Sequence, residues 1–182
     1  MKNTGTNIHL NRGIWVKSDR SQIICKQSLF SKNYHNDIEN FIKNNISETI
    51  NSNVKSKMTD WNLNDNDVFN PLKEWIFNVI NVEYSKFLHH HYNFHMNNLW
   101  GIVYEEGDYA QVHDHLPYFL SFCYYVKCDN NSSPIIFSAS GKKIQAKIGR
   151  LVIFPSHLSH YVPKQKVNQR ICVSGNINVD FK

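Results

Sequence analysis

The chain has 182 residues, of which 41% are hydrophobic, 13% aromatic and 19% charged. Its eleven Phe, nine Tyr and four Trp require a buried core, which excludes intrinsic disorder as the main state. No apolar run reaches the ~18 residues of a membrane span, and the formal net charge of +5 is typical of a solvated basic surface. We predict a single domain over residues 1–182. The first residues lack an apolar signal segment, so we expect a cytoplasmic protein with reduced cysteines.

Residues 1–96 are predicted to form N-terminal strands and helices that pack on a core. Two short apolar runs, 13–16 and 22–25, favour edge strands. A helix is expected to begin at Asn36 or Asp37, because apolar residues follow at helical spacing as far as Ile46. Residues 51–67 are polar and predict turns. A second helix is expected to begin at Asn70 as N-cap, with Pro71 in its first turn, and to end near residues 89–92.

Residues 97–182 change to the period-two pattern of β-strands. The predicted strands cover residues 99–104, 118–126, 134–137, 143–148, 150–154 and 170–179, with glycine or asparagine between several of them. Short strands separated by turn residues indicate a sandwich or barrel. The expected fold class is therefore α+β and mainly β.

Histidines are concentrated where a metal could be bound. His113 and His115 stand two apart, so on a strand both side chains would point to one face. A third ligand could come from His157 or His160, which follow an apolar strand. The alternative is that the pair is an ordinary half-exposed one. Asp114 would face the opposite side of a strand, although it could replace one histidine if the backbone bends.

The run of three histidines at residues 89–91 is a weaker candidate, because consecutive residues on a helix point in different directions.

Arg170 opens an alternating strand and shares one face with Cys172 and Ser174. A buried guanidinium needs an anion, and its planar fork suits a carboxylate. That carboxylate could belong to a ligand or to an internal salt bridge. Tyr125 and Tyr104 could each offer a hydroxyl to the same cavity, or could be core tyrosines.

Four segments together resemble motifs of the iron(II)/2-oxoglutarate-dependent oxygenases. Residues 104–115 resemble the YxxG…HxD/H entry, 121–126 the SxxYYV strand, 149–160 the GxLxxFPxxxxH segment, and 170–176 the arginine strand. The nearest resemblance is to a group of these oxygenases that carries HxH and is common in marine phages and bacteria. If the protein is encoded by a phage, we expect it in the cytoplasm of the host. The resemblance implies a double-stranded β-helix, or jelly-roll, core over residues 97–182, buttressed by helices.

The resemblance also implies a site and a reaction. Fe(II) would be bound by His113, His115 and His160. 2-Oxoglutarate would chelate the iron, and O2 would take its last coordination position. Arg170 and Tyr125 would hold the 5-carboxylate of 2-oxoglutarate, with Tyr104 and Ser174 also in the co-substrate site. The reaction would release succinate and CO2 and hydroxylate a prime substrate that the sequence does not identify.

Two positions depart from the common pattern: His115 stands where most members have a carboxylate, and Cys172 where serine is usual. Two alternatives therefore remain, a three-histidine cupin-type dioxygenase without 2-oxoglutarate and a non-enzymatic jelly-roll binding or structural module. A protein side chain or small metabolite is favoured over nucleic acid as substrate, because no basic stripe with interleaved aromatics is present. The pattern predicts no membrane partner and no particular oligomeric state.

Overall fold

The computed structural model describes residues 23–47, 52–84, 92–167 and 169–180. Within these ranges the strands form two sheets in which all named strand pairs are antiparallel. The major sheet has the order β1-β10-β7-β12-β5-β4-β2, and the minor sheet the order β3-β6-β11-β8-β9.

The strand bounds are as follows. The major sheet contains β1 (Ile24–Gln27), β2 (Ile46–Ser47), β4 (Lys57–Thr59), β5 (Asn93–Tyr104), β7 (Leu120–Lys127), β10 (Arg150–Pro155) and β12 (Arg170–Asp180). The minor sheet contains β3 (Val54–Lys55), β6 (Tyr109–His113), β8 (Ile135–Phe137), β9 (Lys143–Ile144) and β11 (His160–Val162).

From β5 onward the chain passes back and forth between the two sheets. β5, β7, β10 and β12 lie in the major sheet, whereas β6, β8, β9 and β11 lie in the minor one. This alternation is the winding of a double-stranded β-helix, so the predicted fold class is confirmed. The predicted division at residues 96 and 97 stays a prediction, and β5 runs across that position.

Helix α2 (Lys32–Asn44) begins earlier than predicted. Ser31 is its N-cap, and the Ser31 side chain accepts a hydrogen bond from the backbone N–H of Tyr34. The polar first turn has no apolar periodicity, which is why the pattern placed the start too late. The predicted extension to Ile46 is also wrong, because the helix ends at Asn44 and Ile46 pairs with Thr59 in the major sheet.

Helix α3 (Asn70–Tyr84) begins at the predicted residue, but Asn70 does not act as its N-cap. Asn70 has helical dihedral angles and continues from a preceding 3₁₀ turn, η2 (Asp67–Phe69). The capping side chain is that of Asn66, which accepts a hydrogen bond from the backbone N–H of Val68. The predicted end of this helix lies mainly in residues 85–91, outside the described ranges.

Residues 51–67 were expected to be turns, and this prediction is wrong in part. They contain the short strands β3 and β4 and a 3₁₀ turn, η1 (Leu63–Asp65). Val54 pairs with Ala110, and Met58 pairs with Ile102. These strands are too short to show an alternating pattern, so their conformation depends on partners far along the chain.

The strands predicted for the second half are present, with two changes of length. β5 begins at Asn93 rather than at residue 99, and the alternation of residues 143–148 yields only the two-residue strand β9. The edge strand expected at 22–25 appears as β1, whereas the run at 13–16 lies outside the described ranges. β6 and β11 were not predicted as separate elements.

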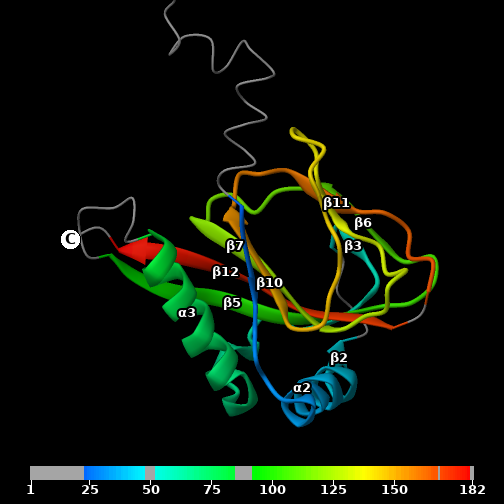
Figure 1. Cartoon of the computed structure of the whole chain (residues 1–182), viewed down its shortest axis with the longest axis horizontal. Helices are drawn as coiled ribbons and strands as arrows, with labels where there is room; N and C mark the ends of the chain where they lie inside the picture. The colour runs from blue at the N-terminus through cyan, green and yellow to red at the C-terminus, as the bar shows by residue number, and fades with distance from the viewer. Residues whose placement is uncertain (1–22, 48–51, 85–91, 168, 181–182) are drawn as a thin grey trace, which may run out of the picture.

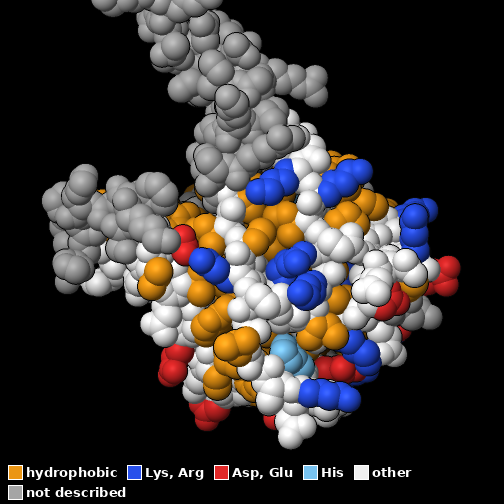
Figure 2. Space-filling model, viewed as in Figure 1, with side chains coloured by type: hydrophobic (Ala, Val, Ile, Leu, Met, Phe, Trp, Pro, Cys, Tyr) orange, Lys and Arg blue, Asp and Glu red, His pale blue; other side chains and the backbone are white. Residues whose placement is uncertain are grey.

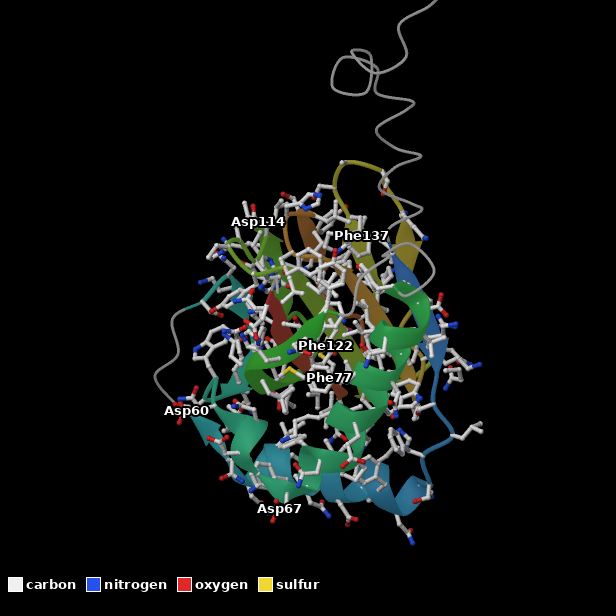
Figure 3. All side chains as sticks on the ribbon, turned by 90° about the vertical axis from the view of Figure 1, so that its left-hand side faces the viewer. Asp60, Asp67, Phe77, Asp114, Phe122 and Phe137 are labelled. Carbon is white, nitrogen blue, oxygen red and sulfur yellow. The ribbon has the colours of Figure 1, made fainter. Side chains whose placement is uncertain are left out.

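The helices cover one face of the major sheet and leave its other face to the minor sheet (Figure 1). One hydrophobic cluster fills the helix side and includes Ile42, Phe122 and the partly buried Phe77. A second cluster lies between the sheets and includes Phe137 and Tyr125. Figure 3 labels one residue pair from the first cluster, Phe77 and Phe122, and Phe137 from the second cluster.

The major sheet approaches α2 closely at Gly101 on β5. A Cβ atom built at this position would lie 2.6 Å from Cγ1 of Ile42. A side chain larger than hydrogen would therefore push the helix away from the sheet. Gly101 thus sets the distance between the two layers.

The surface carries dispersed charge. Figure 2 shows Lys and Arg side chains scattered among apolar and uncharged groups on one face rather than gathered into a stripe. Among the described helices, none combines the length and the apolar character needed to cross a bilayer.

Candidate metal centre and anion site

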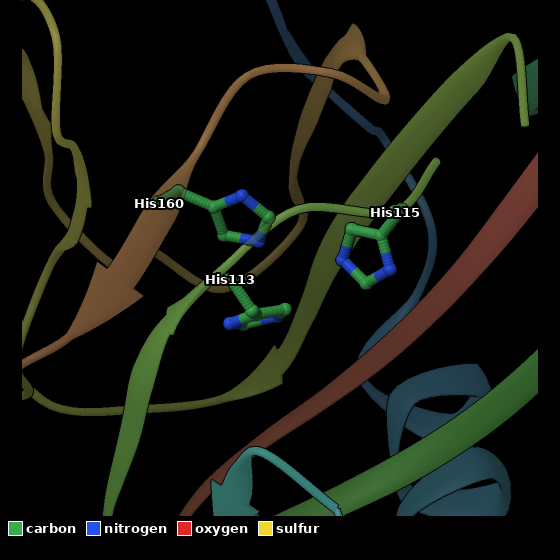
Figure 4. Close-up of side chains that lie close together, drawn as sticks. All are labelled: His113, His115 and His160. Atoms are coloured by element: carbon green, nitrogen blue, oxygen red, sulfur yellow. The ribbon is translucent and has the colours of Figure 1, made fainter. Parts of the chain in front are cut away.

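The three histidines predicted as metal ligands come together at one end of the space between the sheets (Figure 4). His113 is the last residue of β6 and His160 the first of β11, and the two are directly opposite in the pairing of these strands. His115 lies beyond the end of β6, where its backbone N–H donates to the carbonyl of Ser156 at 2.8 Å. The two histidines were expected on one face of a single strand, but only His113 belongs to that strand.

One ring nitrogen from each histidine lies within 4.8 Å of those of the other two. The ring centroids are 4.4 Å apart for His113 and His160, 5.0 Å for His113 and His115, and 5.1 Å for His115 and His160. Three imidazoles at this spacing can bind one metal ion together. Imidazole ligands suit zinc, copper, iron and nickel.

Backbone carbonyls set the tautomers of two of these rings. Nδ1 of His113 lies 2.7 Å from the carbonyl oxygen of Gln111, and Nδ1 of His160 lies 2.8 Å from that of Leu158. A carbonyl can only accept, so each Nδ1 must carry the proton. Each Nε2 therefore keeps its lone pair free for a metal, and the hydrogen bond fixes the ring orientation.

The fold favours the neutral form of all three rings. Burial lowers the pKa of His113, and burial together with the neighbouring His113 lowers the pKa of His115 to about 4. Burial, followed by the charges of His113 and His115, brings the pKa of His160 well below its usual range. A neutral imidazole is the form that binds metal, so these lowered pKa values favour metal binding.

Asp114 lies outside this group of three, in the segment that follows β6. Its carboxylate is exposed and accepts a hydrogen bond from the backbone N–H of Leu116 at 3.2 Å. Figure 3 shows Asp114 toward the end of the molecule opposite the helices. His157, the other candidate ligand, is exposed, and residues 89–91 lie outside the described ranges.

Arg170 is buried in the same cavity, with only 1% of its surface exposed. It pairs with Tyr104 across β12 and β5, and its guanidinium carbon lies 4.5 Å from the Tyr104 ring centroid and 5.1 Å from that of Tyr125. Nη2 of Arg170 donates to the Tyr125 hydroxyl at 3.5 Å. The two aromatic rings thus hold the cation in place.

The remaining donors of Arg170 are available to an anion. Its Nε and Nη1 are buried and have no hydrogen-bond partner, and no carboxylate in the described part of the chain forms an ion pair with it. The internal salt bridge of Arg170, which the sequence allowed as an alternative, is therefore not formed within the described residues. The unpaired N–H groups of this buried guanidinium can donate charge-assisted hydrogen bonds to a carboxylate.

A cavity of about 290 Å³ joins the histidines to Arg170. Tyr104, Cys123, Cys172 and Ser174 line it. Tyr125 is fully buried in the cluster behind it. The alternation predicted for β7 and β12 thus brings Cys123, Cys172 and Ser174 to the wall of this cavity.

Two tryptophans that line this cavity, Trp61 and Trp100, were not predicted as site residues. Trp61 lies in a stretch expected to be turns, and Trp100 was treated only as part of a strand. The period-two pattern places Trp100 on the face that also carries Ile102 and Tyr104, and this was the available signal.

Comparison of the sequence with protein-family models and with curated proteins finds no match. The fold, however, is similar to several solved structures. A viral collagen prolyl hydroxylase from Paramecium Bursaria Chlorella virus-1, in complex with 2-oxoglutarate, has a TM-score of 0.67 and 16% identity over 86% of this chain and 95% of that one.

Two further structures cover nearly the whole chain. A prolyl-4-hydroxylase from Pseudomonas putida has a TM-score of 0.65 at 12% identity, over 90% of this chain and 96% of that chain. A prolyl hydroxylase from Trichoplax adhaerens, bound to a peptide fragment of hypoxia inducible factor, has a TM-score of 0.67 at 12% identity, over 96% and 92%. The resemblance to 2-oxoglutarate oxygenases is thus confirmed for the fold.

Proposed function

We propose that the chain is an iron(II)- and 2-oxoglutarate-dependent oxygenase. His113, His115 and His160 hold Fe(II), and Arg170 with the Tyr125 hydroxyl holds the 5-carboxylate of 2-oxoglutarate. Tyr104 and Ser174 line the co-substrate site between them. The prime substrate is a protein side chain or a small metabolite, and its hydroxylation accompanies release of succinate and CO2.

The observation that carries this proposal is the content of one cavity. Three imidazoles stand together at one place in it, and a buried guanidinium with two unpartnered nitrogens, Nε and Nη1, stands at another. A metal cluster alone would fit many proteins, and a buried arginine alone could be structural. A cavity holding both fits a ligand that binds metal and also carries a carboxylate.

When bound, iron and 2-oxoglutarate supply the oxidising power, and the chain supplies binding and orientation. The Gln111 and Leu158 carbonyls hold His113 and His160 in the metal-binding tautomer. Arg170 holds the carboxylate with its fork aligned, because Tyr104 and Tyr125 pack against the guanidinium. Apolar residues such as Ile135, Phe154 and Val162 line the cavity and keep water away from the reacting groups.

The first experiment is an anaerobic titration of the full chain with Fe(II), with and without 2-oxoglutarate, followed by the weak visible charge-transfer band of the iron–oxoglutarate chelate. We expect a band that requires both components and is lost in Arg170→Ala and in His160→Ala. His157→Ala is the matched control, since His157 is exposed, and should leave the band unchanged. Iron binding without any band would contradict the co-substrate assignment.

The second candidate is a three-histidine dioxygenase that does not use 2-oxoglutarate. The absence of a carboxylate from the described ligand group favours it, since Asp114 lies outside the group. The unpaired donors of Arg170 favour the first proposal. Oxygen consumption with a candidate substrate that is unaffected by removing 2-oxoglutarate would select the second. Failure of the wild-type chain to bind iron would select a non-enzymatic jelly-roll module.

A further inference from the structure

A third unpaired donor lies on the cavity wall besides the two of Arg170. Trp100 is 3% exposed, and its indole Nε1 is buried with no hydrogen-bond partner in the described part of the chain. Among the described residues six buried side-chain atoms have no partner, and the three that belong to cavity-lining residues are on Arg170 and Trp100. An indole N–H can only donate, and it usually finds an acceptor when buried.

Trp100 lies beside the histidine cluster. It is on β5, directly opposite Ser174 of β12, and its ring centroid is 6.0 Å from that of His115. A group that accepts from the indole would therefore lie next to the metal ligands. This donor is distinct from Arg170, which the proposed function assigns to the co-substrate.

Trp61 extends this wall toward solvent. Its ring centroid lies 4.5 Å from that of Trp100 at an interplanar angle of 57°, and 36% of Trp61 is exposed. Its position is held by the backbone, because the Trp61 carbonyl accepts from the N–H of Leu99 on β5 at 3.0 Å. The two rings form a continuous aromatic wall from the surface to the histidines.

We propose that this wall binds the prime substrate, with the Trp100 indole N–H donating to a neutral carbonyl oxygen while an apolar group of the substrate packs on Trp61. The substrate class is thus an amide-type carbonyl compound with an apolar substituent. This inference rests on the proposed function for the chemistry that follows binding, and Trp100 acts by placing the neighbouring carbon of the substrate beside the histidines.

The charged residues of the cavity favour different sites for the substrate carbonyl and for the carboxylate of 2-oxoglutarate. Asp114 also lines the cavity and is exposed, so its carboxylate disfavours a second carboxylate entering from solvent. Arg170 attracts a carboxylate to the other part of the same cavity. A neutral carbonyl is favoured at Trp100, because one uncharged N–H matches one uncharged acceptor without the desolvation of a charge.

The test uses the full chain labelled with ¹⁵N, whose four tryptophans give four indole signals by NMR. Trp100→Phe identifies the Trp100 signal. Trp75→Phe is the matched control, since Trp75 lies on α3 in the helix-side cluster. The probes are the N-acetyl N-methylamides of leucine, phenylalanine and proline, and N-acetylleucine provides the carboxylate match.

We expect at least one amide to shift the Trp100 indole proton downfield in a saturable way, as a new hydrogen bond would. Its Kd should rise about 3- to 10-fold in Trp100→Phe, the usual effect of losing one neutral hydrogen bond, and stay unchanged in Trp75→Phe. N-acetylleucine should bind more weakly than the leucine amide. A purely structural role for Trp100 would not produce the downfield shift.

The titration is made first without metal or 2-oxoglutarate and then with Zn(II) and 2-oxoglutarate, so its result does not depend on iron chemistry. No saturable shift of the Trp100 signal with any amide in either state, an equal Kd in Trp100→Phe, or tighter binding of the carboxylate would overturn the inference. A chain that shows the Trp100 shift but binds no iron would refute the proposed function alone.

Discussion

His160 and His113 stand directly opposite each other on β11 and β6, with their ring centroids 4.4 Å apart. Residues opposite each other in an antiparallel pair are the closest cross-strand neighbours. The pairing of the two strands therefore brings together ligands from distant parts of the chain. His115 joins them because the Ser156 carbonyl holds its backbone next to the end of β10.

Replacing His160 by Ala should remove a metal ligand that the sheet positions. We expect the affinity for Fe(II) or Zn(II) to fall at least ~100-fold, since even loss of an outer partner of a ligand costs 10- to 100-fold. Calorimetry under anaerobic conditions measures this change, with His157→Ala as the control. Tight metal retention by His160→Ala would rule out the three-histidine site.

Arg170 should lower the stability of the chain when no carboxylate is bound. Arg170→Met removes two buried unpaired donors, so we expect the free energy of unfolding without ligand to rise by about 1 kcal/mol. The same change should abolish the increase in melting temperature that 2-oxoglutarate and metal give the wild type. Urea denaturation and thermal melts measure both effects. A less stable Arg170→Met chain would mean that contacts with Tyr104 and Tyr125 outweigh the unpaired donors.

Gly101 should tolerate no side chain while Ile42 is present. The added methyl group of Gly101→Ala would overlap Ile42, so we expect a loss of about 1–3 kcal/mol in the free energy of unfolding. In an Ile42→Ala background the same change should cost less than half as much, because the clashing atoms are gone. Urea denaturation of the four chains gives the coupling. Additive losses would show that the clash does not determine the spacing.

Glu39 should make stability depend on pH in the acidic range. Burial acts to raise the pKa of Glu39, but the hydrogen bonds and charges of Lys127 and Lys43 outweigh it and lower the pKa below the ordinary value of 4.5. The folded state therefore favours the ionised carboxylate. This stabilisation is complete above pH ~4.5 and disappears as the pH falls through the lowered pKa of the folded state.

The matching variant is Glu39→Gln. Its loss at pH 7 should be about 1 kcal/mol, because the two ion pairs at 2.8 and 2.5 Å are partly exposed and screened by solvent. The difference from wild type should shrink below pH 4 and in high salt. Denaturation curves at pH 7 and pH 3.5 test this, and a constant difference between them would contradict the assignment to Glu39.

Local pattern predicted much of this protein. The strands that became β7, β10 and β12 were predicted because their apolar residues follow a period of two or form unbroken runs in sequence. The same periodicity placed Arg170, Cys172 and Ser174 on one face. The resemblance at His113, His115, His160 and Arg170 pointed to the same site. These signals depend on neighbours along the chain, so they are visible without a fold.

Tertiary structure decided what depends on distant partners. β3 and β4 are two and three residues long and exist because β6 and β5 supply their hydrogen bonds. Ile46 fits the helical pattern of the sequence but lies in a strand, because it pairs with Thr59. The unpaired state of Arg170, and the contact of Trp61 with Trp100, result from which side chains the two sheets enclose together. Hydrogen bonding and burial between segments are properties of the closed fold, and no local periodicity encodes them.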